Sequence, residues 1–146
     1  MSKEILLLSG PNLNLLGTRS PEIYGTDTLE AHVARATARA AVGGFQLRHL
    51  QSNFEGVLIE AIHEARGVAS GIVINAGALT HTSWALNDAL ATFAGPKVEI
   101  HLSNPAAREP FRHLSTLAGV VSGSIAGFGP LSYELGIDAV VSLLNQ

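Results

Sequence analysis

Residues 71–77 read GIVINAG, a short and uninterrupted apolar run that ends on an asparagine, an alanine and a glycine. Strands buried on both faces of a parallel sheet carry continuous runs of this kind, whereas half-exposed strands alternate apolar and polar residues. The run therefore predicts a central strand of a parallel sheet, with Asn75 at its carboxyl end.

Four similar runs lie elsewhere in the chain, and segments with a helical pattern separate most of them. The predicted strands are residues 5–9, 45–50, 71–75, 98–102 and 120–125, and the predicted helices are residues 29–41, 56–65, 83–93 and 131–144. Asp27 with Glu30 resembles a capping box, which predicts that the first helix starts near Thr28. A shorter turn over residues 106–113 is expected to join strands four and five.

This alternation predicts an α/β fold: a flavodoxin-like open sheet of five parallel strands, order 2-1-3-4-5, with helices on both faces. In such sheets ligands bind beyond the carboxyl ends of the strands, at the point where the strand order reverses. Polar residues follow three of the predicted strands there, at 9–12, 75–77 and 101–104. We therefore expect the functional site at this edge.

The composition fits one domain spanning residues 1–146, with 47% apolar and 14% charged residues, and the high apolar share hints at subunit contacts. A net charge of −3 leaves no basic stripe, so nucleic acid is not an expected partner. No run approaches the roughly 20 apolar residues of a membrane span. The first four residues lack a signal-peptide layout and the chain has no cysteine, which favours a cytoplasmic location.

The connection over residues 10–26 is long for a strand-to-helix loop, where about 2–6 residues are typical. One interpretation is a disordered surface excursion. The favoured interpretation is a mobile lid over residues 18–26 that brings Arg19 and Tyr24 over the site.

Several common chemistries lack their motifs. The chain has no GxxxxGK[ST] or GxSxG sequence, and the glycines at 127–129 do not complete a dinucleotide fingerprint. Ser9 and Asn75 stand where a phospho-acceptor domain needs acidic residues. The histidines show no metal-binding spacing, so no metal or other cofactor is expected. Imine chemistry needs a desolvated lysine, but Lys3 and Lys97 fall at strand starts, opposite the expected site.

The remaining candidates can supply an acid and a base. Glu99 and His101 are two residues apart in a strand and so share a face, where a carboxylate can orient an imidazole as a general acid. A structural pair in a polar patch is the alternative. Forming a phenolate from a tyrosine at pH 7 costs roughly 4 kcal/mol, which a nearby arginine reduces. Arg19 could do this for Tyr24; otherwise Tyr24 is an ordinary surface tyrosine.

The chain also resembles a known family, the type II 3-dehydroquinate dehydratases (3-dehydroquinases). Its blocks occur in order over nearly the whole chain: GPNLNLLG (10–17) followed by Arg19, Pro21 and Tyr24-Gly25, QSN (51–53) with Glu55-Gly56, NAGA (75–78) with THTS (80–83), VEIHLSN (98–104) with Arg108-Glu109 and Phe111-Arg112, and residues 123–129. Ser20, Asn87 and Trp84 depart from the family pattern, which affects lid closure and assembly more than proton transfer.

The resemblance implies dehydration of 3-dehydroquinate to 3-dehydroshikimate by anti elimination through an enolate, without a Schiff base or a metal, in the shikimate or quinate pathway. Tyr24 would be the base, assisted by Arg19. Asn12 would hold a water that stabilises the enolate oxygen. His101, oriented by Glu99, would protonate the departing hydroxyl.

The resemblance also implies a set of substrate-binding residues: Asn75, His81 and Arg112 for the ring hydroxyls, the backbone amides of Leu102 and Ser103 for the carboxylate, and Asp88 from a neighbouring subunit. The family forms trimers that assemble into dodecamers. His81 could instead cap the next helix, Asp88 could be a solvated face residue, and the role of Arg108 stays open.

Two other interpretations compete with the enzyme: a flavodoxin-like module that binds a small carboxylate or phosphate without turnover, and an inactive structural subunit. Neither requires the paired provision of a base and an acid, so the lyase is favoured.

Overall fold

A computed structural model describes residues 3–146. Met1 and Ser2, two of the four residues on which the signal-peptide prediction rests, lie outside the described residues. The described residues form five strands: β1 (Glu4–Ser9), β2 (Gln46–Gln51), β3 (Gly71–Asn75), β4 (Lys97–His101) and β5 (Gly123–Ala126). The same residues form five α-helices: α1 (Pro21–Tyr24), α2 (Leu29–Val42), α3 (Glu55–Ala65), α4 (Trp84–Ala91) and α5 (Leu131–Leu144). Short 3₁₀ helices complete the fold, η1 (Leu13–Leu15), η2 (Gly77–His81), η3 (Pro105–Ala107) and η4 (Pro110–His113).

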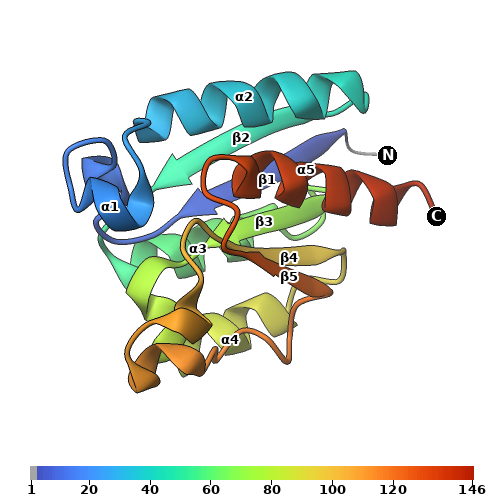
Figure 1. The fold of residues 1–146 in the computed structure, drawn as a ribbon. Coiled ribbons are helices and arrows are strands. Elements are labelled where there is room, and N and C mark those ends of the chain that lie inside the picture. The colour runs from blue at the N-terminus through green and yellow to red at the C-terminus, as the bar shows by residue number, and fades with distance from the viewer. Residues whose placement is uncertain (1–2) are drawn as a thin grey trace.

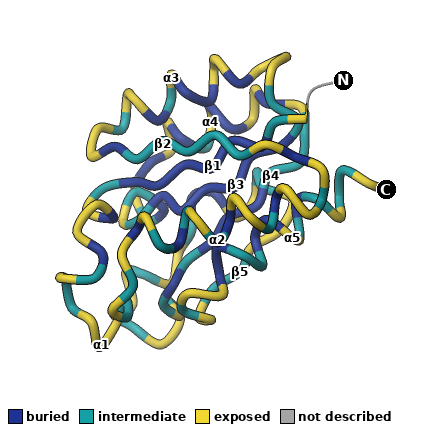
Figure 2. The backbone as a smooth tube through the Cα atoms, turned by 90° about the horizontal axis from the view of Figure 1, so that it is seen from above, coloured by how far each residue is buried: buried dark blue, intermediate teal, exposed yellow. Residues whose placement is uncertain are grey.

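The five strands form one parallel sheet in the order β2-β1-β3-β4-β5, which confirms the predicted topology. Helices α2 and α5 cover one face and α3 and α4 cover the other (Figure 1). Strands β1 and β3 are buried on both faces, as their continuous apolar runs predict, and they lie dark blue at the centre of Figure 2.

Alternation of side chains along the strands divides the core into two layers. Ile5, Leu7 and Val73 pack beneath α2 and α5, whereas Leu6 and Ile72 pack against α3 and α4. Each layer is shielded from water by amphipathic helices, whose outer sides are exposed (Figure 2).

Some predicted boundaries were wrong. Strand five was expected at residues 120–125 but starts at Gly123, because Val120 and Val121 turn back on Leu117 and pack against the α3/α4 layer from a loop. The predicted turn at residues 106–113 is two 3₁₀ helices instead of one segment, η3 and η4.

One helix is shorter than predicted, and another starts where predicted but has a different capping residue. The predicted helix over residues 83–93 is shorter, because Ser83 is its N-cap and accepts a hydrogen bond from Leu86 N. The start of α2 near Thr28 is confirmed, but Thr28 caps it by accepting from Ala31 N, whereas Asp27 binds Arg35.

The carboxyl ends of β1 and β3 meet at a very close backbone approach. A Cβ on Gly10 would lie 2.5 Å from the carbonyl oxygen of Ala76, so only glycine fits there. Gly77 has φ +60°, a left-handed conformation that also favours glycine. These two residues bring the loop after β1 onto the loop after β3, at the switch point of the sheet.

Candidate active site

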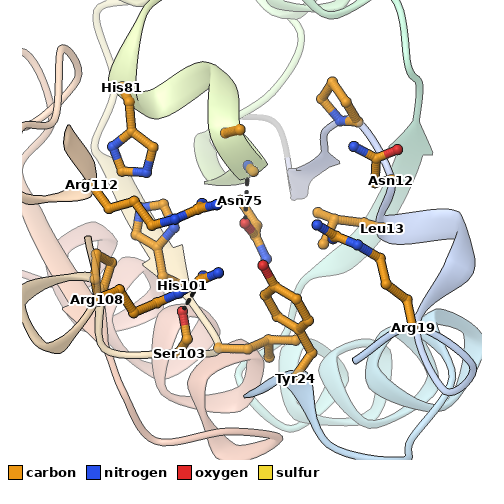
Figure 3. Close-up of a pocket in the computed structure, with 15 residues that line it drawn as sticks. Asn12, Leu13, Arg19, Tyr24, Asn75, His81, His101, Ser103, Arg108 and Arg112 are labelled. Atoms are coloured by element: carbon orange, nitrogen blue, oxygen red, sulfur yellow. Dashed lines mark hydrogen bonds between the residues drawn. The ribbon is translucent and has the colours of Figure 1, made fainter. Parts of the chain in front are cut away.

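A pocket opens at the carboxyl edge of the sheet, where the strand order predicts it (Figure 3). Its wall combines the loop after β1, the ends of β3 and β4 and the 3₁₀ segments that follow them. It is lined by Pro11, Asn12, Leu13, Arg19, Tyr24, Asn75, Gly77, Ala78, His81, His101, Leu102, Ser103, Pro105, Arg108 and Arg112. Most of the predicted site residues therefore come together in one place.

The acid candidate is anchored in the sheet. His101 ends β4, and its Nε2 lies 2.6 Å from Oε2 of Glu99, two residues earlier on the same strand face. The Glu99 carboxylate is buried, with only 1% of the residue exposed. Because Nε2 is held by the carboxylate, Nδ1 is the ring nitrogen left to exchange a proton with a ligand.

Three hydroxyl groups complete the shell around Glu99. Thr80 Oγ1 donates to Oε2 at 3.0 Å, Ser115 Oγ donates to the carboxylate at 2.9 Å, and Ser124 Oγ lies 3.4 Å from Oε1. Burial alone would raise the pKa of Glu99, but the hydrogen bonds and charge of His101 and the hydroxyl donors lower it below its usual value. The buried carboxylate therefore stays ionised and paired.

The base candidate comes from the long loop after β1. Tyr24 ends α1, a single helical turn, and its ring lies between two cations. The guanidinium carbon of Arg19 is 4.7 Å from the ring centre and that of Arg108 is 5.3 Å away. Both distances lie within the roughly 6 Å of a cation–π contact. Arg19 therefore lies beside Tyr24, and Arg108, whose role the sequence left open, lies beside it as well; that Arg19 assists Tyr24 as a base stays a prediction.

Asn12 is held by residues of the loop after β2. It adopts a left-handed conformation with φ 70°, which asparagine tolerates better than most residues. Its backbone N–H donates to Asn53 Oδ1 at 2.9 Å. Gln51 Nε2 donates to Asn53 Oδ1 and to the Gly10 carbonyl, both at 3.2 Å. Gln51 and Asn53 thus position the asparagine at the pocket wall.

Three further predicted ligand contacts line the pocket. Asn75 ends β3, and its Oδ1 accepts from Gly77 N at 3.2 Å. His81 Nδ1 lies 2.7 Å from the Leu114 carbonyl, which can only accept, so Nδ1 carries the hydrogen and Nε2 remains for a ligand. Arg112 is fixed by a bond from its Nε to Glu109 Oε2 at 3.1 Å.

Leu102 and Ser103 also line the pocket, directly after β4. Arg108 Nη1 lies 3.3 Å from Ser103 Oγ, so the arginine that flanks Tyr24 is also tied to this strand end (Figure 3).

Asp88 does not line the pocket within one chain; it is exposed on α4. Sequence reasoning missed Thr80, Ser115 and Ser124 as partners of Glu99, because no regular spacing relates them to it.

The described residues contain neither a membrane-spanning helix nor a metal-binding cluster. Over residues 3–146, every helix is too short or too polar to cross a bilayer. In the same part of the chain, no cluster of three or more histidine or acidic side chains could hold a metal ion.

A parallel α/β sheet that presents a cation-flanked phenol and a carboxylate-bound imidazole to one pocket has the groups that an enzyme of the acid–base class requires. Residues 3–141 match the family described as dehydroquinase class II. The chain belongs to this family.

Relatives support the assignment over the full chain. The chain is 56% identical to the 3-dehydroquinate dehydratase of Synechococcus sp. (strain CC9902), covering 97% of both chains. It is 55% identical to that of Caulobacter vibrioides, covering 99% of both. The crystal structure of the type II dehydroquinase from Propionibacterium acnes superposes with a TM-score of 0.91 at 40% identity, covering 97% of this chain and 98% of that one.

Proposed function

We propose that this enzyme dehydrates 3-dehydroquinate to 3-dehydroshikimate by anti elimination through an enolate, without a Schiff base or a metal. The observation that carries the proposal is the pairing, across one pocket, of Tyr24 between two guanidinium groups with His101 on a buried carboxylate. Family membership and the names of the relatives support the substrate.

The first step takes a proton from the carbon next to the ketone. The Tyr24 phenolate accepts that proton, and the C–H electron pair moves into the enolate. Arg19 and Arg108 flank the ring and stabilise its negative charge before the transfer. A water held by Asn12 stabilises the enolate oxygen, as the oxyanion holes of other enzymes do.

The second step expels the hydroxyl group. The enolate electrons re-form the ketone and create the conjugated double bond, while the C–O bond breaks. His101 gives its proton to the departing oxygen, so water leaves and the imidazole becomes neutral. The ionised Glu99 holds the imidazole ring in place through its contact with Nε2. Solvent then returns the proton from Tyr24 to His101.

The pocket residues that do not transfer protons bind the substrate. Asn75, His81 and Arg112 bind the ring hydroxyls, and the backbone amides of Leu102 and Ser103 receive the carboxylate. The two lysines support a route without an imine: Lys97 starts β4 and its Nζ donates to the Phe93 carbonyl, and Lys3 precedes β1, both at the opposite edge of the sheet.

The residues at 18–26 act as a lid in this proposal, and Asp88 reaches the site of a neighbouring subunit. Trp84 and Asp88 are four residues apart on α4 and both are exposed, so they share one helix face. A large exposed apolar side chain beside the acid supports a subunit contact there. The assembly of trimers into a dodecamer, a cytoplasmic location and a place in the shikimate or quinate pathway stay predictions.

The test is to mix purified protein with 3-dehydroquinate and follow the ultraviolet absorbance of the conjugated enone. Wild type should raise the absorbance, and Tyr24→Phe should lose about 10²–10⁴-fold of the rate. Glu22→Gln is the matched control, because Glu22 is exposed on the same helical turn and does not line the pocket.

Absence of any absorbance rise with folded wild-type protein would refute the dehydratase and favour the binding module. Retention of turnover by Tyr24→Phe would keep the substrate and remove Tyr24 as the base.

A further inference from the structure

We propose that Tyr133 is a positioning residue that holds the side-chain amide of Asn75 for substrate binding, and that Ser9 and His49 support it from behind. The inference rests on the proposed function, in which Asn75 binds the substrate. Tyr133 does not line the pocket, so it acts on the ligand only through Asn75.

The orientation of the Asn75 amide follows from its two neighbours. The backbone N–H of Gly77 can only donate, so it selects Oδ1 of the amide, at 3.2 Å. The amide nitrogen then faces the other way, and Nδ2 donates to the phenol oxygen of Tyr133 at 3.4 Å. An amide nitrogen carries two hydrogens, so one remains for a ligand in the pocket that Asn75 lines.

Tyr133 is itself rigidly held. It lies in the first turn of α5, it is fully buried, and the ring of His32 stacks on it with centres 5.1 Å apart and planes 21° from parallel. Burial raises the pKa of the Tyr133 phenol, which keeps it protonated. The phenol therefore accepts from Asn75 and must pass its own hydrogen to another acceptor.

That acceptor is Ser9, the last residue of β1, and the chain of bonds continues to β2. Ser9 Oγ lies 3.1 Å from the Tyr133 oxygen and 2.9 Å from Nε2 of His49. Both hydroxyl hydrogens have a partner when Tyr133 donates to Ser9 and Ser9 donates to Nε2 of a neutral His49. Burial lowers the pKa of His49, which agrees with a neutral ring. The amide is thus fixed by bonds spanning three strands and α5.

A buried network of this kind could serve stability alone, and a coupling measurement separates the two roles. We would determine kcat and KM for Tyr133→Phe, Asn75→Ala and the double variant. Tyr133→Phe should raise KM about fivefold, the size of one lost hydrogen bond, with kcat within about twofold, because ground-state binding is what it affects. In the Asn75→Ala background, the same substitution should change KM by less than about twofold.

Ser132→Ala is the matched control. Ser132 is the neighbour of Tyr133 and equally buried, and within the described residues its hydroxyl has no hydrogen-bond partner. Its removal should leave KM unchanged. Ser9→Ala, which takes away the acceptor of the phenol hydrogen, should raise KM in the same direction as Tyr133→Phe and also lose that effect in the Asn75→Ala background.

Multiplicative effects of Tyr133→Phe and Asn75→Ala on KM, or an unchanged KM in Tyr133→Phe, would overturn the proposal. Crystal structures of ligand-free wild type and Tyr133→Phe add a readout without substrate: the Asn75 amide should lose its single orientation in the variant, and an unmoved amide also overturns the proposal. A wild type without turnover on 3-dehydroquinate is a different result, because it refutes the proposed function and leaves the structural comparison valid.

Discussion

The two halves of the pocket are built in opposite ways. His101 ends a central strand, and its partner Glu99 is buried beneath three hydroxyl groups. Tyr24 stands at the end of a four-residue helical turn in a long surface loop, where its half-buried ring packs against the rim of one core layer and lies beside two arginine side chains. The acid is part of the core, whereas the base is brought to it by a loop.

This difference separates two requirements of an elimination. A proton donor that must stay charged in a buried place needs a fixed counter-ion and satisfied hydrogen bonds, which only the sheet interior supplies. A base that must reach over the substrate after it binds has to come from a segment that can open. Substitutions in the two halves should therefore affect activity and stability in different proportions.

The largest expected effects compare His101→Asn with Tyr24→Phe. Each removes a proton-transfer group, so each should lower kcat by about 10²–10⁴-fold. Their free energies of unfolding should differ. Tyr24→Phe should stay within about 0.5 kcal/mol of wild type, because its ring contacts remain. His101→Asn should lose about 1.5–3 kcal/mol, because the buried Glu99 carboxylate loses its hydrogen bond to His101 Nε2. Urea unfolding at pH 7.5 measures both, and equal losses would contradict the comparison.

Glu99→Gln should have the next largest effect. The neutral amide presents N–H donors to Thr80 and Ser115, whose hydroxyls also donate, and it no longer favours a protonated His101. We expect kcat to fall about 10–100-fold, less than removal of the imidazole itself, and stability to fall about 2 kcal/mol. Glu64→Gln is the control, because Glu64 is exposed on α3 and does not line the pocket. A fully active Glu99→Gln would show that Glu99 has only a structural role.

Most of the fold could be predicted from local patterns. The apolar runs of β1 and β3 predict burial on both faces, and this places the switch point and the pocket between them. Strand five was misplaced because Val120 and Val121 form an apolar stretch in a loop, and hydrophobicity alone does not separate a core-packed loop from a strand.

The candidate site was predictable to the extent that its residues are neighbours in sequence. Glu99 and His101 share a strand face, and Arg19 and Tyr24 share a loop, so spacing reveals both pairs. Ser115 meets Glu99 across 16 residues and Tyr133 meets Ser9 across 124, contacts that exist only after the layers have packed. No periodicity records such contacts.

Acid should weaken the protein in two stages. Burial lowers the pKa of His32 and His49 below the ordinary value of 6.5, so below pH 6.5 the unfolded chain binds more protons than the folded one. Stability is therefore complete above about pH 6.5 and falls as pH drops. Glu99, with its pKa lowered from 4.5, adds a second loss as pH falls through its folded value.

Urea unfolding between pH 8 and about pH 3, at one protein concentration, measures these stages. His49→Gln should flatten the stage just below pH 6.5 and leave the Glu99 stage in place. Stability that rises between pH 7 and pH 5 would contradict the assignment. The result sharpens the comparison between the two halves of the pocket. As pH falls, Glu99 should become protonated at a lower pH than His32 and His49, which lie behind Asn75.

The smallest expected effect concerns the loop that carries the base. Ser20 caps α1 with φ 39° and ψ 61°, a left-handed conformation that costs a residue with a Cβ about 1–2 kcal/mol. Ser20→Gly removes that cost but adds about 0.5–1 kcal/mol of chain entropy, so the net gain should be below about 1 kcal/mol, or roughly 2–4 °C in Tm. Ser20→Ala is the matched control, because it deletes the hydroxyl, which caps no backbone N–H, and keeps the Cβ. If both variants shift Tm equally, backbone strain is not the cause. If only Ser20→Gly is stabilised and its KM stays unchanged, the strain lies in the loop that carries Tyr24 and is separable from substrate binding, as expected of a base carried by a loop and not by a strand.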